Sequence, residues 1–185
     1  MIVSETALPG ALVIEPARHG DHRGFFSESW SRRRMEEAGI DLDFVQDNHS
    51  LSTEVCTLRG LHYQAPPHAQ AKLVRCGRGS LSDVIVDVRK GSPTYGQSLS
   101  VDLSFDNSRQ LLVPVGFLHG FITREPNTEI VYKVSDYYSA DCDGAVRWDS
   151  CGIDWSCDTD PIISPKDAEA VPFSDWQSPF EWTGT

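Results

Sequence analysis

The chain is short of positive charge and contains no long apolar run. It carries 16 lysines and arginines against 27 aspartates and glutamates, which gives a net charge of −11 over 185 residues. This balance argues against non-specific nucleic-acid binding, which needs a basic surface, and against attraction to anionic membranes. Because no stretch of about 18 apolar residues occurs, we expect no transmembrane helix. The first residues lack the basic and apolar regions of a signal peptide, so we expect a cytoplasmic protein.

Paired cysteine motifs are also missing. The five cysteines are an odd number and include no CxxC pair, and the three nearest the end of the chain have a spacing that fits no zinc site. We therefore expect reduced structural thiols of the kind found in a cytoplasm. The residues are Cys56, Cys76, Cys142, Cys151 and Cys157.

Short apolar runs separated by turn sequences dominate the chain. In residues 80–89 three valines share one face, while Asp83, Ile85, Asp87 and Arg89 share the other, which is the period of a strand. Similar runs predict strands at 11–15, 25–30, 43–48, 57–63, 70–76, 97–103, 109–113, 119–124 and 129–135.

Helical signals are confined to one stretch. Residues 31–38 are compatible with a helix that Ser31 caps and Gly39 terminates. Many strands and little helix predict a β-sandwich or barrel. We find no repeat or linker, so we expect one domain over residues 1–185, with a tail from about residue 150 that packs on the barrel as turns and short helices.

The scarce positive charges are concentrated in one region. Arg59, His62, Lys72, Arg75 and Arg78 lie within twenty residues, partly on predicted core strands. The alternation of the second strand places Lys72 inward, and a buried lysine is costly without an anionic partner, so such a cost usually marks a functional site. In LRGLHYQ a regular strand would place the side chains of Arg59 and His62 on opposite faces. Both could lie on the same face only if the glycine between them forms a bulge.

Other candidate residues are individually unremarkable. His119 lies in PVGFLHGF, and Tyr132 points inward in EIVYKV if its two neighbours face outward. Lys166 and Asp167 are adjacent in SPKD. Taken alone, each is more often a core residue or part of a solvated turn than part of a site.

A metal site needs several convergent ligands, which this sequence does not offer. Metal-binding cupins use an HxH pair followed by a glutamate and a later histidine, but here Tyr63 and Gln64 follow His62. His19 and His22 lie in a glycine-rich turn that is not typical of a metal site. We expect a site without metal or other cofactor.

A set of motifs in a fixed order resembles the dTDP-4-dehydrorhamnose 3,5-epimerase family. The resemblance covers about residues 10–180, and LRGLHYQ followed by QAKLV and GSPTYG is its most specific part. It also includes DHRGFFSESW, FVQDNHS, VPVGFLHGF, YKVSDYY and SPKD. It implies a cupin-type β-barrel or jelly roll with a few short helices, usually in a homodimer built by strand exchange.

The resemblance also implies roles for single residues. His62 matches the base that removes a proton, Asp167 its carboxylate partner, Tyr132 the proton donor on the opposite side of the sugar, and Lys72 the lysine beside the keto oxygen. Tyr138 matches a residue that stacks on thymine. One departure is Asp143, which stands where the family often has glutamate. The implied substrate-binding residues are Arg23, Glu28, Gln46, Asn48, Arg59, His119, Tyr138, Asp143 and Lys166.

The implied chemistry agrees with these residue types. The C–H bonds at C3 and C5 flank a C4 ketone, so loss of either proton gives an enolate. Inversion then needs a base and an acid on opposite walls of a cleft and no redox cofactor. A neutral histidine has suitable basicity near pH 7, and a lysine can stabilise the enolate oxygen. Arginines such as Arg59 are suited to the diphosphate of a dTDP-linked 4-keto-6-deoxy sugar.

Two other functions fit part of the pattern. One is an epimerase that acts at only C3 or only C5, or on a related nucleotide sugar. The other is a sugar-nucleotide-binding barrel without catalysis, which has no need for a base and an acid together. A metal-dependent oxygenase of the same fold is disfavoured by the missing HxH pair.

Overall fold

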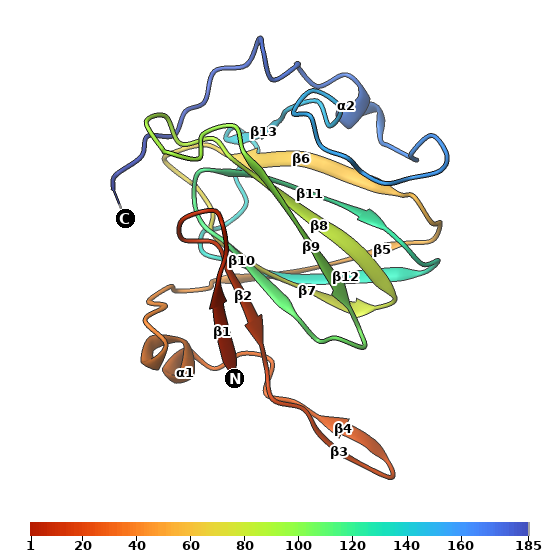
Figure 1. Cartoon of the computed structure of the whole chain (residues 1–185). Helices are drawn as coiled ribbons and strands as arrows, with labels where there is room; N and C mark the ends of the chain where they lie inside the picture. The colour runs from red at the N-terminus through yellow and green to blue at the C-terminus, as the bar shows by residue number, and fades with distance from the viewer. Residues whose placement is uncertain (185) are drawn as a thin grey trace.

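The computed structural model describes residues 1–184, whose strands form two facing sheets and a separate hairpin (Figure 1). The larger sheet has the order β1 (Ile2–Glu5), β2 (Leu12–Glu15), β10 (Gln110–Val113), β7 (Lys72–Arg78), β12 (Thr128–Val134) and β5 (Gln46–Ser52). The smaller sheet has the order β13 (Asp143–Ala145), β6 (Leu58–Gln64), β11 (Phe117–Thr123), β8 (Ser80–Asp87) and β9 (Ser98–Ser104). The predicted jelly-roll barrel of the cupin type is confirmed.

Alternation along β8 shows how the smaller sheet separates two apolar layers. Ile85 faces the larger sheet and packs in the barrel interior with Val74 and Ile130. Val84 and Val86 face the opposite side and pack under the C-terminal tail. Because both faces of β8 are buried, its side chains follow the period of two that the sequence shows.

The outer face of the larger sheet is covered by the chain around α1 (Arg32–Glu37). Met35 packs there against Leu73 and Leu112. Ser31 is the N-cap, and Gly39 follows the helix with a φ of 81°, a left-handed conformation that suits glycine. The predicted helix is therefore confirmed, one residue shorter at each end, but the Ser31 side chain makes no capping hydrogen bond.

The C-terminal tail lies over the outer face of the smaller sheet (Figure 1). Trp155 and Phe180 are buried there, and Ile162 forms a parallel bridge with Thr57 just before β6. Beyond this bridge the tail forms the short helix α2 (Pro165–Ala168), which contacts β6. The tail thus brings its own side chains to the strand that carries His62.

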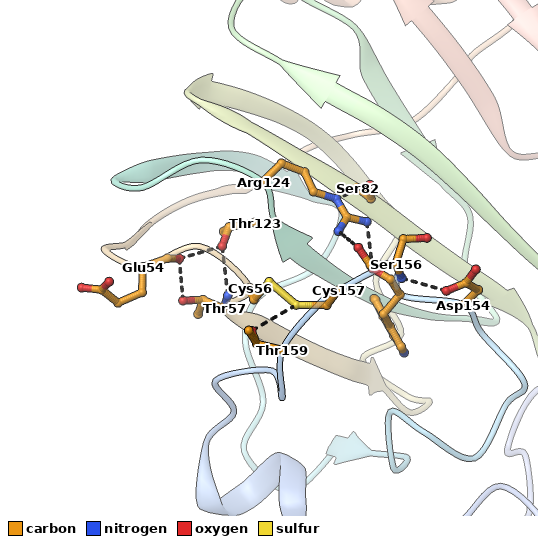
Figure 2. Close-up of a disulfide and its surroundings, with 11 residues drawn as sticks. Glu54, Cys56, Thr57, Ser82, Thr123, Arg124, Asp154, Ser156, Cys157 and Thr159 are labelled. Atoms are coloured by element: carbon orange, nitrogen blue, oxygen red, sulfur yellow. Dashed lines mark hydrogen bonds between the residues drawn. A yellow bond between two sulfur atoms is a disulfide. The ribbon is translucent and has the colours of Figure 1, made fainter.

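A disulfide between Cys56 and Cys157 ties the tail to the start of β6 (Figure 2). The two Cα atoms are 6.3 Å apart, within the range that disulfides require. Arg124 binds the same loop through the carbonyl oxygens of Trp155 and Ser156. The prediction that all the cysteines are reduced thiols is wrong for this pair, because 101 positions separate two residues that only the fold brings together.

A two-stranded hairpin, β3 (His19–Asp21) and β4 (Gly24–Phe26), extends away from the barrel on the side opposite α2 (Figure 1). Side chains of β4 and β1 leave apolar surface exposed, including Phe26 at 71% and Ile2 at 63%. Within residues 1–184, no helix is long and apolar enough to cross a membrane.

Candidate active site

A cleft opens between the two sheets at the end of the barrel near β13. It is lined from the smaller sheet by His62 and Gln64, and from the larger sheet by Lys72 and Tyr132. His62 and Tyr132 therefore project from opposite walls. The remaining lining residues are Gln46, Asn48, Tyr63, Gln70, Tyr138 and Asp143.

A bulge in β6 places His62 in this cleft. His62 lies opposite His119 on β11, whereas Arg59 lies opposite Phe121, so β6 contains one residue more than its neighbour. Gly60 is the extra residue and has a φ of 144°. A Cβ atom there would lie 2.6 Å from the Cα of Gly120, so only glycine allows this approach of the strands. The sequence left a bulge at this glycine open as an alternative, and the structure contains it.

His62 forms a pair with Asp167 of α2. Nε2 of His62 lies 2.6 Å from Oδ1 of Asp167, and the other carboxylate oxygen accepts the Gly60 N–H at 3.4 Å. The Asp167 side chain is 3% exposed, and its backbone N–H is bound by Ser164, the N-cap of α2. A histidine that donates from Nε2 keeps Nδ1 free to accept a proton, so the pair has the arrangement of an oriented base.

The charge of Asp167 follows from competing effects. Burial alone raises its pKa, but the hydrogen bonds from His62, Gly60 and Ser164 and the charge of His62 outweigh burial and lower the pKa. Asp167 therefore stays ionised at neutral pH. An ionised carboxylate stabilises the imidazolium that forms when His62 takes a proton.

Lys72 projects into the cleft from the first position of β7. Burial lowers its pKa to about 8, while the nearby charges of Asp83 and Asp143 partly oppose the shift. A lysine in this state is still mostly protonated at pH 7. It can donate a proton to, or place a positive charge beside, an oxygen that becomes negative in the cleft.

Tyr132 lies across the cleft on β12, between the buried Ile130 and Val134 of the same inner face. Burial raises its pKa, and Arg59 and Asn48 oppose that shift without cancelling it. The phenol is therefore protonated at neutral pH and can act as an acid. Its predicted inward orientation is confirmed.

Polar side chains at the mouth of the cleft bind one another. Asp143 accepts a hydrogen bond from Lys166 and one of 3.5 Å from the hydroxyl of Tyr138. The side-chain amide of Gln46 donates to Asn48 at 2.9 Å and accepts the backbone N–H of Tyr138 at 3.2 Å. Asp143 thus reaches both neighbours. The 60% exposed ring of Tyr138 is available for stacking.

Arg59 and His119 lie next to the cleft rather than on its lining. Arg59 binds Ser52 and the Leu51 carbonyl on β5 while its charge acts on Tyr132. His119 is 7% exposed and has its Nε2 atom 2.8 Å from Oδ1 of Asp83. Burial lowers the pKa of His119, although Asp83 opposes the shift.

Two predicted site residues are not brought to the cleft by this chain. Arg23 lies at the tip of the β3–β4 hairpin and pairs with Asp21. Glu28 follows the hairpin and pairs with Arg34 of α1 at 3.0 Å. Both belong to the part of the molecule that points away from β6 and α2 (Figure 1).

The sequence prediction overlooked Asp83, Gln64 and Gln70. Gln64 and Gln70 line the cleft, and each lies on the predicted face of His62 or Lys72, which was the available signal. Asp83 is fully buried on β8, beside His119. The sequence did contain an indication of Asp83: a carboxylate in an apolar strand, on the same face as Ile85.

No group of three or more histidine, cysteine, aspartate or glutamate side chains is arranged to hold a metal ion within residues 1–184. The fold and the site define the class of protein: a cupin-type barrel whose cleft has a histidine–aspartate pair on one wall and a tyrosine on the other.

Comparisons with known proteins specify the class further. The family model for dTDP-4-dehydrorhamnose 3,5-epimerase matches residues 5–175. The enzyme of that name from Salmonella typhimurium is 49% identical over 173 residues, which are 92% of this chain and 94% of that protein. The chain therefore belongs to the dTDP-4-dehydrorhamnose 3,5-epimerase family, as its motifs indicate.

Solved structures agree in fold. The Bacillus anthracis dTDP-4-dehydrorhamnose 3,5-epimerase with TDP and pyrophosphate bound is 48% identical, with a TM-score of 0.90 over 93% of this chain and 99% of that one. The Legionella pneumophila epimerase in complex with dTDP-4-keto-L-rhamnose is 41% identical, with a TM-score of 0.90 over 94% of this chain and 93% of that one.

Proposed function

We propose that this protein epimerises dTDP-4-dehydro-6-deoxy-D-glucose at C3 and C5 to give dTDP-4-dehydro-L-rhamnose. The observation that carries this proposal is the placement of the His62–Asp167 pair and Tyr132 on opposite walls of one cleft, with Lys72 between the two sheets. Family membership supplies the substrate class. The site residues supply the means of inversion.

Each inversion is a pair of proton transfers. Nδ1 of His62 takes the proton from C3 or C5, and the electron pair of the broken C–H bond moves toward the C4 oxygen to form an enolate. Lys72 stabilises that oxygen, and Asp167 stabilises the imidazolium. The hydroxyl of Tyr132 then protonates the same carbon from the opposite face. Solvent returns the proton to the tyrosinate and removes one from His62, so no redox cofactor is consumed.

The mouth of the cleft suits the nucleotide. The exposed ring of Tyr138 is placed to stack on thymine, and Gln46, Asn48 and the Asp143–Lys166 pair surround it. Arg59 lies near the wall of Tyr132, where a guanidinium can bind the diphosphate. His119 is more deeply buried, so its role is directed to the sugar rather than to the nucleotide.

Arg23 and Glu28 require a second copy of the chain. In one chain they lie far from the cleft, on and after a hairpin with exposed apolar side chains. Exposed apolar patches of this kind mark interaction surfaces. We propose a homodimer in which the hairpin of each copy completes the site of the other. Cytoplasmic location also remains a prediction.

Mixing two inactive variants tests the shared site. If Arg23 acts across the dimer, subunit exchange between Arg23→Ala and His62→Ala proteins yields heterodimers that contain one intact site. Activity then rises toward a quarter of the wild-type value for statistical mixing. Unchanged activity after verified exchange shows that Arg23 acts within its own chain or not at all.

The decisive experiment is proton NMR of dTDP-4-dehydro-6-deoxy-D-glucose with the protein in D₂O. Exchange at both C3 and C5, with formation of dTDP-rhamnose by a coupled 4-reductase, is the expected result. Exchange at one carbon identifies a single-site epimerase instead. Binding without exchange at either carbon identifies another substrate or a binding module.

A further inference from the structure

Asp83 is a buried carboxylate that does not bind the surrounding structure through both of its oxygen atoms. It lies on the inner face of β8 with 0% of its surface exposed. Oδ1 accepts a hydrogen bond from Nε2 of His119 at 2.8 Å, whereas Oδ2 is buried and has no hydrogen-bond partner within residues 1–184. Burial of a carboxylate with an unused oxygen is costly, so a compensating role is expected.

Asp87, four residues along the same strand, shows what a structural aspartate looks like in this protein. It too is fully buried, but its two oxygens bind the Arg89 guanidinium and the hydroxyls of Ser92 and Thr94. These contacts fix the turn that follows β8. Asp83 has no arginine and no hydroxyl partner of this kind among the described residues.

The charged groups that face Asp83 belong to the cleft. Lys72 on β7 and His119 on β11 both feel its negative charge. Of the two carboxylates that raise the pKa of Lys72 against burial, Asp83 has the larger effect and Asp143 on β13 the smaller. His62 and Lys72 in turn lower the pKa of His119. Tyr63, Tyr132 and Tyr138 complete the titratable lining.

We propose that Asp83 is a positioning residue for the epimerase reaction, through its effects on His119 and Lys72. It holds the His119 proton on Nε2, which fixes the ring and leaves Nδ1 as an acceptor. Its charge also keeps Lys72 protonated, so that the lysine is cationic when the C4 oxygen becomes an enolate. This inference rests on the proposed function, since both residues would act on the 4-keto sugar.

The Asp83→Asn variant tests the inference because it removes the charge and preserves the shape. Lys72 then loses its stronger counter-charge, so its pKa falls below about 8. The expected result is that kcat falls by about fivefold at pH 8 and that the basic limb of the kcat profile moves about one pH unit lower. KM for the sugar nucleotide and Kd for dTDP should change by less than about threefold, because Asp83 is remote from the nucleotide subsite.

The matched control is Asp87→Asn, on the same strand and equally buried. It should lower Tm and leave the pH of the basic limb unchanged. If Asp83→Asn also lowers Tm only, with an unmoved pH profile, Asp83 is structural and the inference is wrong. Wild-type exchange in D₂O is measured first, so an inactive wild type rejects the proposed function rather than the role of Asp83.

A second measurement needs no variant. Long-range ¹H–¹⁵N NMR of the wild-type protein distinguishes the histidine tautomers, and His119 should be neutral with its proton on Nε2 between pH 7.5 and 9. A proton on Nδ1 would overturn the inference even if the Asp83→Asn protein does not fold.

Discussion

Nε2 of His62 lies 2.6 Å from Oδ1 of Asp167, although 105 positions separate the two residues in the chain. The partner of the proposed base is thus delivered by the C-terminal tail, which the Thr57–Ile162 bridge holds against β6. The barrel strand β6 places His62 in the cleft, and the hydrogen bond to Asp167 of the tail fixes the orientation of its ring. The tail therefore contributes a residue to the proposed active site and does not only cover the apolar face of the smaller sheet.

Replacement of Asp167 by asparagine tests this arrangement. The asparagine amide has no negative charge with which to stabilise the imidazolium of His62. It can also turn its NH₂ group, a donor, toward His62 instead of its oxygen, an acceptor. We expect kcat to fall about 10²- to 10⁴-fold, the range typical for a positioned acid–base group. Kd for dTDP should be unchanged. Calorimetric titration with dTDP and a steady-state assay measure the two quantities, and near-normal kcat would contradict the role of Asp167.

The His62→Ala protein should bind dTDP but lose turnover. His62 is the one histidine on the lining of the cleft, and Asp167 orients it, so no other lining residue among residues 1–184 is expected to replace it. His49→Ala is the matched control, because His49 also pairs with a carboxylate, Glu129, but on the exposed face of β5. The control should retain normal exchange in D₂O. Substantial exchange by His62→Ala would remove His62 from the role of base.

Tyr132→Phe separates proton removal from inversion. Loss of the hydroxyl leaves His62 able to exchange a substrate proton with solvent on its own face. Deuterium incorporation should therefore persist while formation of the rhamnose configuration falls by at least about 10²-fold. NMR in D₂O follows both in one sample. If exchange and inversion fall by the same factor, Tyr132 is not the selective acid.

Arg59→Ala should weaken binding of the sugar nucleotide. A charge-assisted hydrogen bond typically contributes about 1.5–3 kcal/mol, so Kd should rise by roughly 10- to 150-fold. kcat at saturating substrate should change less. Arg78→Ala provides the comparison, because Arg78 is exposed near Glu129 and away from the cleft. Equal Kd values for the Arg59 variant and the wild type would exclude Arg59 from the diphosphate site.

The strands of this protein could be predicted where one face meets a core. The alternation in residues 80–89 and the inward position of Tyr132 reflect local periodicity, and the structure confirms both. Strands β1, β3 and β13 were not predicted, because they are three or four residues long and largely lack buried apolar side chains. Strand 25–30 was overestimated for a related reason: β4 ends at Phe26, and its exposed aromatics imitate a core pattern.

Candidate site residues, including Asp167 as the partner of His62, could be predicted from the family resemblance, but their placement could not be predicted from local patterns. No local pattern shows that Asp167 reaches His62 or that Cys56 meets Cys157, because tertiary contacts decide both. The position of Arg23 could not be predicted from a local pattern either. The family resemblance assigns Arg23 to the site, whereas in this chain it lies on a hairpin far from the cleft. Asp83 had a local signal, a carboxylate facing inward on an apolar strand, but its partner His119 comes from another strand.

The disulfide should stabilise the fold by restricting the unfolded chain. For a loop of about 100 residues the chain-entropy model gives about 4.7 kcal/mol, and measured effects are typically 2–4 kcal/mol. The Cys56→Ser/Cys157→Ser protein should therefore lose about 2–4 kcal/mol of unfolding free energy in urea. Cys142→Ser is the control, since Cys142 is a half-buried free thiol and should change stability little.

Reduction of the wild-type protein provides the complementary measurement. Dithiothreitol should lower its Tm toward that of the double variant and leave the Tm of the double variant unchanged, because only one of the two proteins has a bond to reduce. The reduced protein should keep most of its activity at temperatures below its Tm, since the Thr57–Ile162 bridge and the Arg124 contacts still hold the tail near β6. Alkylation of Cys56 and Cys157 in native protein without reductant, together with a Tm that dithiothreitol does not move, would show that the bond does not form.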